Sequence, residues 1–147
     1  MKTETALLMR APAERIYGLA AEVERWPAFL PHYRWVSVLE RKGDVKLVEM
    51  AASRDGIPVR WQAVQQLFPD VPRITFRHVR GVTRGMDVEW WFEEQDGQTL
   101  VRIRHDLTLR WPLVGDWIAD RVIGPQFVEN IARKTLRRIK ALAEQTA

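Results

Sequence analysis

The sequence has 147 residues, of which 46% are hydrophobic and 29% charged, a composition typical of one folded globular domain rather than a disordered or fibrous chain. It has no cysteine, so disulfide frameworks, thiolate nucleophiles, cysteine-ligated zinc, iron–sulfur clusters and c-type haem are excluded. Lysine and arginine (23) exceed aspartate and glutamate (19) by four. That modest surplus needs other support before it indicates nucleic acid or an anionic membrane.

The first residues do not resemble a targeting segment. The apolar run from Ala6 to Met9 is shorter than the hydrophobic region of a signal peptide. No stretch of the sequence approaches the roughly 18 apolar residues that span a bilayer. We therefore expect a cytoplasmic protein.

The first 31 residues predict one strand and two short helices. Residues 3–9 alternate weakly and end at Ala11-Pro12. Residues 13–24 then show the helical spacing of Ile16, Leu19, Ala20 and Val23, and Pro12 suits the start of that helix. Trp26-Pro27 is expected to end it, because the residue before a proline is disfavoured in helical geometry. Residues 28–30 can form one further short turn before Pro31.

From Arg34 the apolar period changes to two, which predicts strands. Six runs are separated by turn signals, at residues 34–41, 45–52, 57–68, 73–80, 86–93 and 99–109. Two of the turns contain Asp-Gly, at Asp55-Gly56 and Asp96-Gly97, which is a strong hairpin signal. The links are too short for the crossovers of a parallel sheet, so we expect an antiparallel one.

After Trp111-Pro112 the period returns to that of a helix. A short helix is predicted through Leu113, Trp117, Ile118 and Val122, with an interruption at Gly124-Pro125. A long terminal helix follows, with an apolar stripe of Phe127, Val128, Ile131, Thr135, Ile139 and Leu142. The expected fold is a single α+β domain over residues 1–147, in which a curved antiparallel sheet of about six to seven strands wraps around this helix. One helix does not fill the concave side of such a sheet, so we expect a cavity between them.

The alternation along the strands indicates which side chains line that cavity. In the third predicted strand it places Val59, Trp61, Ala63, Gln65 and Leu67 on one face. In the last strand Val101, Ile103, His105, Leu107 and Leu109 alternate with charged and polar residues, so His105 points inward. The candidate ligand-binding residues are Trp61, Ala63, Leu67, Phe76, His78, Trp90, Ile103, Trp117, Phe127 and Ile131.

His105 is the best acid or base candidate in the sequence, and the alternative is a satisfied histidine of the pocket wall. Gln65 can hydrogen-bond a substrate carbonyl, or it can simply bond a neighbouring backbone group. His32 and His78 lie on other elements without the spacing of metal ligands, so no metal site is expected. Neither of the two serines lies in a Gly-x-Ser-x-Gly turn, and no glycine-rich phosphate loop is present.

Three surface features allow two interpretations each. Trp91 points away from Trp90 and is either an edge aromatic packed by arginine stems or part of a protein contact. Trp111, Leu113, Trp117 and Ile118 either pack as a helix or gate the pocket mouth. The positive side of the last helix is a solvated face, or it meets an anionic membrane or nucleic acid; its cations are Arg133, Lys134, Arg137, Arg138 and Lys140.

Three segments resemble the START-like (SRPBCC) superfamily: residues 11–17 (APAERIY), 23–31 (VERWPAFLP) and 36–41 (VSVLER). Within it the chain is most similar to the polyketide cyclase/dehydrase and coenzyme Q chaperone branches, and the resemblance covers essentially the whole chain. It implies the helix-grip fold and a hydrophobic molecule bound between sheet and helix. Some members fold a bound polyketide chain toward cyclisation.

The resemblance also implies roles for three positions. Single-domain aromatase/cyclases have a tyrosine after the Trp-Pro segment, which Tyr33 matches, and a pocket tryptophan on a later strand, which Trp61 matches. Four residues further on they place a pocket arginine, where this sequence has Gln65. A neutral amide can hydrogen-bond a carbonyl but supplies neither charge nor a proton to an enolate.

The sequence therefore supports two functions. The preferred one is binding of a hydrophobic small molecule, such as a lipid, a polyketide or a quinone-like ring, without a cofactor or metal. The alternative is a polyketide cyclase, aromatase or dehydratase, with Tyr33, Gln65 and His105 as candidate catalytic residues. Nucleic-acid binding is not expected, because the short arginine runs lack interleaved aromatic residues. Membrane contact and a homodimer stay open.

Overall fold

The computed structural model describes residues 2–54, 56–81, 83–107 and 125–145. Within these residues, seven strands form one antiparallel sheet in the order β1-β7-β6-β5-β4-β3-β2. The strands are β1 (Lys2–Met9), β2 (Tyr33–Lys42), β3 (Val45–Arg54), β4 (Ile57–Phe68), β5 (Arg73–Gly81), β6 (Asp87–Gln95) and β7 (Gln98–Asp106). The helices are α1 (Ala13–Ala21), the 3₁₀ helix η1 (Val23–Arg25), α2 (Trp26–Phe29) and α4 (Pro125–Ala143).

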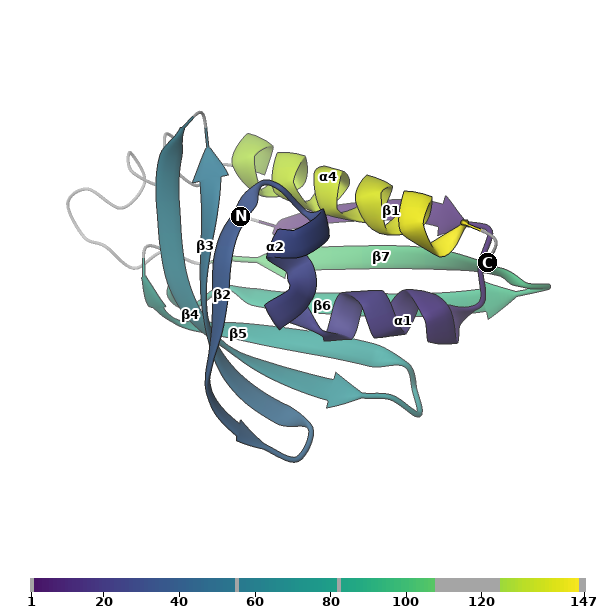
Figure 1. The fold of residues 1–147 in the computed structure, drawn as a ribbon, viewed down its shortest axis with the longest axis horizontal. Coiled ribbons are helices and arrows are strands. Elements are labelled where there is room, and N and C mark those ends of the chain that lie inside the picture. Colours follow the sequence, from purple (N-terminus) through teal and green to yellow (C-terminus); the bar gives the residue numbers. More distant parts are fainter. Residues whose placement is uncertain (1, 55, 82, 108–124, 146–147) are drawn as a thin grey trace.

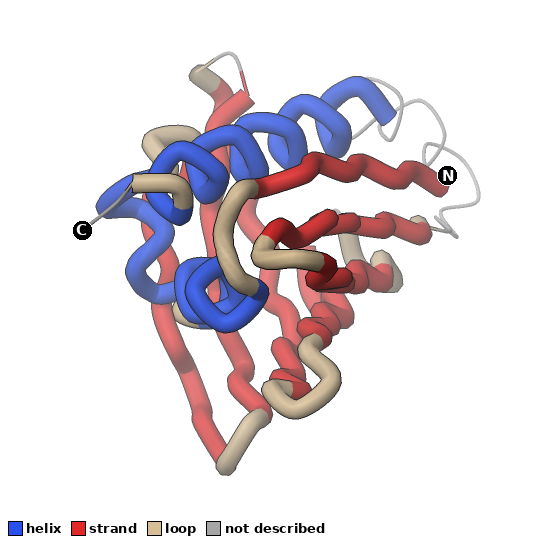
Figure 2. The backbone as a smooth tube through the Cα atoms, turned by 90° about the vertical axis from the view of Figure 1, so that its right-hand side faces the viewer, coloured by secondary structure: helices blue, strands red, loops and turns tan. Residues whose placement is uncertain are grey.

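The helices of the described residues lie on one side of the curved sheet (Figures 1 and 2). The long helix α4 runs beside β1, and α1 packs against both α4 and β6. The short helix α2 lies against the start of β2. The predicted antiparallel sheet, the long helix and the short helices after the first strand are confirmed.

Strands β2 to β7 are joined in sequence by hairpins, and β1 closes the sheet by pairing with β7 from Lys2↔Asp106 to Met9↔Thr99. The turn between β6 and β7 shows why these hairpins form. Asp96 and Gly97 both have positive φ, 55° and 78°, which matches the right-handed twist of the flanking strands.

The structure corrects the helical prediction before the sheet. Helix α1 ends at Ala21, three residues earlier than expected, and Trp26-Pro27 begins α2 instead of ending the first helix. The reason is the position of Pro27 in the first turn of α2. A proline in the first turn of a helix loses no internal hydrogen bond, because the first N–H groups of a helix have no partner within it.

Helix α4 presents a narrow buried stripe to the sheet. Its buried residues are Val128, Ala132, Thr135, Leu136, Ile139 and Ala143, with the spacing of a helix of 3.6 residues per turn. The stripe contains small residues, Ala132 and Ala143, and the hydroxyl of Thr135. The predicted short helix through Leu113 and Val122 lies outside the described residues.

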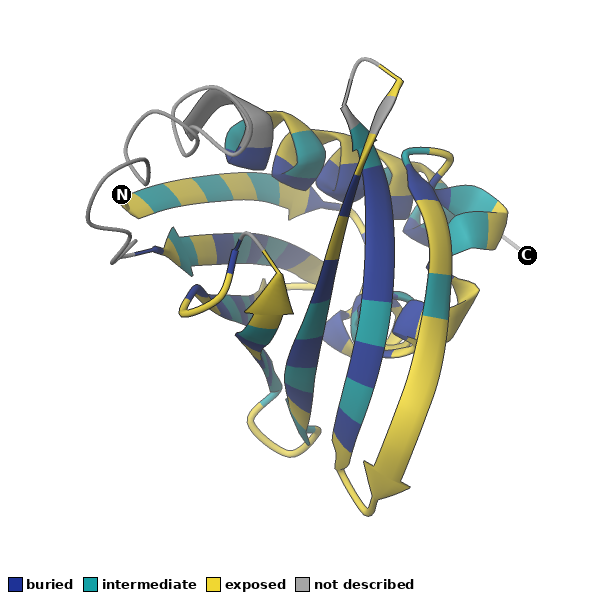
Figure 3. Cartoon of the chain, turned by 90° about the vertical axis from the view of Figure 1, so that its left-hand side faces the viewer, coloured by how far each residue is buried: buried dark blue, intermediate teal, exposed yellow. Residues whose placement is uncertain are grey.

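Burial divides the sheet into a covered part and an open edge (Figure 3). In β3 the residues Lys46, Val48, Met50 and Ala52 face inward and are buried. In β2, by contrast, almost every residue after Tyr33 is exposed, including Trp35 at 38% and Leu39 at 48%. Two register shifts interrupt its pairing with β3, near Arg34 and Leu39. Such bulges on an edge strand disfavour pairing with further strands.

No helix among the described residues is both long enough and apolar enough to cross a membrane.

Two glycines allow a matched test of the backbone. Gly81 has a φ of +102°, and a Cβ there would lie 2.6 Å from the carbonyl oxygen of Arg60, whereas Gly18 lies on α1 with open space around it. We expect Gly81→Ala to lower the free energy of unfolding by about 2 kcal/mol or more. Gly18→Ala should raise it by about 0.5–1 kcal/mol. Urea titrations of both variants measure this, and equal effects would contradict the assigned strain.

Candidate functional site

A hollow opens between the inner face of the sheet and α4, as the sequence predicts. Its cavity volume is about 70 Å³, and the empty space is about 620 Å³ when the opening to solvent is included. The enclosed part of the hollow is therefore small. The described residues that line this hollow are Trp26, Tyr33, Met50, Trp61, Phe76, His78, Thr83, Met86, Val88, Trp90, Ile103, His105, Val128, Ile131, Ala132 and Thr135.

Aromatic rings form one continuous wall of the hollow. Trp26 contacts Tyr33 edge-on, with ring centroids 5.0 Å apart, and lies 5.8 Å from Trp90 and 6.3 Å from Phe76. Tyr33 in turn lies 6.3 Å from Trp61. Such a wall offers flat apolar surface and edge-to-face contacts to a planar guest.

One cluster of polar side chains at the hollow is formed by His78 on β5, Thr83 in the turn after it, and His105 on β7. The ring of His78 stacks on Trp61 with an interplanar angle of 13° and a centroid distance of 5.5 Å. Its Nδ1 lies 2.7 Å from the hydroxyl of Thr83. His105 is half-buried beside it, and its Nδ1 is covered and has no hydrogen-bond partner in the structure. The cluster can therefore exchange hydrogen bonds with a guest.

A second polar group joins β2 to α4. The Thr135 hydroxyl donates to the carbonyl of Ile131 at 2.7 Å, so its oxygen is left as an acceptor. That oxygen lies 3.0 Å from His32 Nε2 and is also bonded to the Tyr33 hydroxyl. These bonds connect the start of the sheet to the helix on either side of the hollow.

The titratable groups at the hollow are uncharged near pH 7. Burial lowers the pKa of His78 to about 3 and that of His105 to about 4, and the proximity of His105 adds to the effect on His78. Burial also lowers the pKa of His32 to about 4, with a smaller contribution from Lys134. The pKa of Tyr33 is raised by burial, and its hydrogen bond with Thr135 opposes this shift. These imidazoles are therefore neutral and only weakly basic, because burial disfavours their protonated forms.

Most of the residues proposed from the sequence meet at the hollow. Eight of them line it, namely Tyr33, Trp61, Phe76, His78, Trp90, Ile103, His105 and Ile131. Ala63, Gln65 and Leu67 face the same side of β4 but are not among its lining residues. Ala63 and Gln65 are fully buried, and Leu67 packs at the margin of the core. Trp111, Leu113, Trp117 and Ile118 lie outside the described residues, as does the side chain of Phe127.

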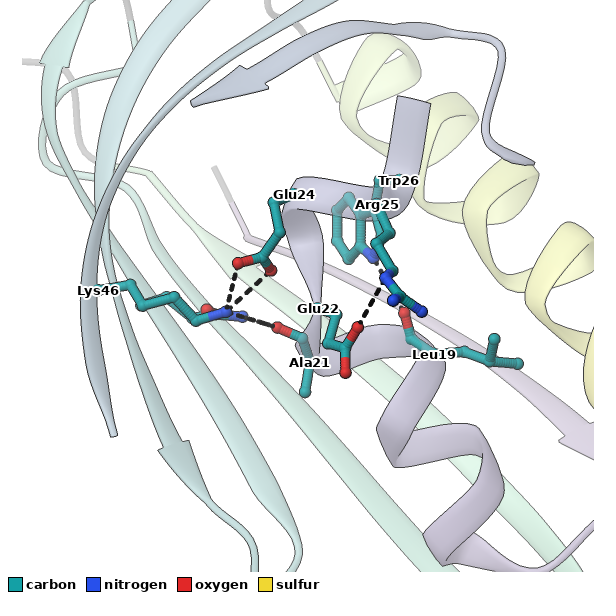
Figure 4. Close-up of polar contacts among 8 residues, drawn as sticks. Leu19, Ala21, Glu22, Glu24, Arg25, Trp26 and Lys46 are labelled. Atoms are coloured by element: carbon teal, nitrogen blue, oxygen red, sulfur yellow. Dashed lines mark hydrogen bonds and ion pairs between the residues drawn. The ribbon is translucent and has the colours of Figure 1, made fainter. Parts of the chain in front are cut away.

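Gln65 takes part in a different polar cluster, below the end of α1. Its amide nitrogen donates to the carbonyl of Ala21 at 3.0 Å, and its Oε1 is buried without a partner. Lys46 lies opposite it on β3 and donates to the same carbonyl at 3.4 Å and to Glu24 at 3.0 Å (Figure 4). Of the two roles that the sequence allows for Gln65, the structure shows the hydrogen bond to a backbone group, the carbonyl of Ala21.

Sequence reasoning missed two kinds of lining residue. In the sequence, the Trp26-Pro27 pair indicates only the end of a helix. In the structure, Trp26 Nε1 donates to the carbonyl of Leu19 and the Trp26 ring lines the hollow. Thr83 lies in a turn, where no periodicity indicates direction. Val88 and Met50 could have been found by extending the alternation used for Trp61 to their own strands.

The described residues contain no group of three or more His, Asp or Glu side chains placed to hold a metal ion.

Comparison with known proteins identifies the family. Residues 9–133 match the model of the family described as polyketide cyclase / dehydrase and lipid transport. The chain belongs to this family. The resemblance of residues 11–41 to the START-like superfamily left two branches open, and the match is to the polyketide cyclase/dehydrase branch.

Three similar curated proteins come from Streptomyces. The chain is 30% identical over 145 residues to the granaticin polyketide synthase bifunctional cyclase/dehydratase of Streptomyces violaceoruber, covering 97% of this chain and 43% of that protein. It is 34% identical over 102 residues to the actinorhodin polyketide synthase bifunctional cyclase/dehydratase of Streptomyces coelicolor, covering 68% and 32%. The chain thus spans less than half the length of these two relatives. A putative polyketide cyclase of Streptomyces halstedii is 27% identical, covering 68% and 94%.

Solved structures confirm the START-like fold. The Zhui aromatase/cyclase from Streptomyces sp. R1128 superposes with a TM-score of 0.88 at 20% identity, covering 98% of this chain and 93% of that one. A START superfamily protein from Mycobacterium smegmatis superposes with a TM-score of 0.73 at 16% identity, covering 98% and 97%.

The buried histidines predict a loss of stability in mild acid. Their pKa values lie below the ordinary 6.5, so as the pH falls below about 6.5 the unfolded chain takes up protons that the folded chain does not. The free energy of unfolding should fall toward pH 4, by up to about 1.4 kcal/mol per pH unit for each fully buried histidine. Glu24 has a lowered pKa and changes the free energy of unfolding only below about pH 4.5, so it does not contribute to the fall between pH 6.5 and 5.

Urea titrations of the wild type and of His78→Gln between pH 8 and 4 measure the effect. The variant should show a shallower slope, because one of the depressed groups is gone. A wild-type stability that stays constant between pH 6.5 and 5 would contradict the neutral state assigned to these rings.

Proposed function

We propose that this protein binds an uncharged, hydrophobic, polyketide-like molecule in the hollow between the sheet and α4. The observation that carries the proposal is the aromatic wall of the hollow, together with two small clusters of polar side chains. The family match supports it, because the model that fits residues 9–133 describes cyclases, dehydrases and lipid transport proteins. Burying an ion there would be costly, because none of the described lining residues carries a charge at pH 7.

A second proposal is that the bound molecule is a poly-carbonyl chain and that the protein promotes its cyclisation and dehydration. The names of the granaticin and actinorhodin relatives favour it, since both are bifunctional cyclase/dehydratases. So does His105, a neutral imidazole at the hollow with an unpartnered Nδ1. Holding the two reacting carbons in contact can supply roughly 7–11 kcal/mol of the barrier reduction by orientation alone.

The protein has to supply only proton transfers for the bonds that form and break in the bound chain. In the ring-closing step His105 takes a proton from a carbon flanked by two carbonyls. The resulting enolate carbon bonds to a distant carbonyl carbon, and the oxygen of that carbonyl becomes an alkoxide that takes the proton back. Dehydration then removes a second carbon-bound proton and expels the hydroxyl as water. The Tyr33 hydroxyl, whose pKa is raised by burial, gives its one proton to Thr135, so its oxygen is left to accept a hydrogen bond from a hydroxyl of the guest.

Gln65 has no part in this proposal, because Ala21 already accepts its amide N–H. Residence in the cytoplasm, a homodimer and membrane contact stay predictions. On α4, Lys140 pairs with Glu144 and Arg138 bonds the carbonyl of Phe29, so part of its positive charge is engaged within the chain.

Two tryptophans give a matched test of binding. Trp61 lines the hollow. Trp91 lies on the face of β6 opposite to Trp90, away from the hollow, and its indole N–H donates to Glu89. We expect Trp61→Ala to weaken the Kd for 1-naphthol, measured by calorimetry, by about tenfold or more, from the loss of roughly 1.5 kcal/mol of aromatic contact. Trp91→Ala should change it less than about twofold, given its distance from the ligand. Equal effects, or no binding to the wild type, would refute the assigned site.

A matched pair of β7 variants tests catalysis. The substrate is a synthetic aryl 1,3,5,7-tetraketone, in which the carbon between the first two carbonyls can close a six-membered ring on the fourth, and the measurement is the rate of the cyclised product that has lost water, followed by mass spectrometry. His105→Gln should lower kcat by about 10²-fold or more, since general-base catalysis contributes roughly 10²–10⁴-fold. Arg104→Gln, which changes the exposed residue next to His105 on β7 and is outside the lining, should leave kcat within about threefold. If His105→Gln retains full turnover, the base is not His105.

A further inference from the structure

The region where α1 ends is tied to the sheet by two buried side chains. Lys46 on β3 and Gln65 on β4 are directly opposite each other and are 2% and 0% exposed. Both donate to the carbonyl oxygen of Ala21, at 3.4 Å and 3.0 Å. We call this arrangement of Lys46, Gln65, Ala21 and Glu24 the corner cluster.

The end of a helix is where such donors are stabilising. The last carbonyls of α1 have no partner within the helix, and the helix dipole places partial negative charge there. The ammonium of Lys46 supplies both a hydrogen-bond donor and a full positive charge. Glu24, in the following turn, completes its environment with two contacts of 3.0 Å and 3.3 Å. A buried lysine without these partners would be costly.

The same terminal turn of α1 holds a wall of the hollow. The carbonyl of Leu19, two residues before Ala21, accepts the indole N–H of Trp26 at 3.2 Å (Figure 4). The Trp26 ring then reaches Tyr33, Phe76 and Trp90 and lines the hollow. A continuous series of contacts therefore runs from β3 and β4, through the last turn of α1, to the aromatic wall.

We propose that Lys46 and Gln65 are positioning residues that set the place of Trp26 and thereby the shape of the hollow. Neither is among the lining residues, so they act through the terminal turn of α1. The expected effect on the affinity for a planar ring rests on the proposed binding function. The link between the corner cluster and Trp26 stands on geometry alone.

Gln65→Leu separates positioning from stability. The change removes the N–H donor to Ala21, but it also removes the buried Oε1 that has no partner. Replacing an unsatisfied polar group by an apolar one of similar size offsets the lost hydrogen bond, so the variant should fold. Lys46→Met removes the ammonium in the same way. Lys140→Met is its matched control, because it breaks a lysine–glutamate pair at the far end of α4.

The first arm of the test needs no ligand. Protein labelled with 5-fluorotryptophan gives one fluorine NMR resonance for each tryptophan, and Trp26→Phe assigns the resonance of Trp26. Gln65→Leu, Lys46→Met and their combination should shift or broaden this resonance and leave that of Trp91, on the outer face of β6, unchanged. Lys140→Met should move neither. An unmoved Trp26 resonance in the combined variant overturns the proposal.

The second arm is a double-mutant cycle on the affinity for 1-naphthol. Gln65→Leu should weaken the Kd about fivefold in the wild-type background and less than about twofold in the Trp26→Phe background, as expected of residues coupled through one contact. The same fold-change in both backgrounds shows that Gln65 does not act through Trp26 and overturns the proposal. If 1-naphthol fails to bind the wild type, the binding function is refuted, and the fluorine resonances still decide whether the corner cluster positions Trp26.

Discussion

The hollow depends on aromatic rings that are held by fixed partners and so do not collapse into the space beside them. An unfilled apolar space forfeits dispersion contacts, and a freely rotating side chain would close it. Trp26 is bound at its indole N–H by the carbonyl of Leu19, and Trp61 is held by the stacked ring of His78. His78 is itself bonded to Thr83. On the opposite side, α4 contributes Ala132 and Thr135, which are too small to fill the gap.

The burial of these rings also determines the charge of the side chains at the hollow. The same burial that holds the rings lowers the pKa of His78 and His105, so their imidazoles stay neutral near pH 7. The chain therefore offers hydrogen bonds and a weak base to its guest, where a pocket arginine would offer permanent charge. That combination suits the uncharged carbonyl compounds proposed as its guests, and in the proposed cyclisation the orientation of the two reacting carbons would supply much of the rate enhancement.

Periodicity predicted the strands well because each strand is defined by its own residues and by the turn that follows it. The alternation of Trp61, Phe76, Trp90 and Ile103 was enough to predict a shared inner face. Gln65 illustrates the limit of that reasoning. Alternation gives the face of a side chain, but whether Gln65 meets a guest or the carbonyl of Ala21 depends on a helix 44 residues away in the sequence. The start of a helix at Trp26 likewise depended on proline being tolerated in a first turn.

The most direct test of this account is a crystal structure of the protein grown with 1-naphthol. The account predicts electron density for the planar ring between the aromatic wall of Trp61 and Trp90 and the α4 residue Ile131, with its hydroxyl within hydrogen-bond distance of His105 or Tyr33. A hollow filled by the chain's own side chains, with naphthol bound only on the outer face beside Trp91, would contradict it.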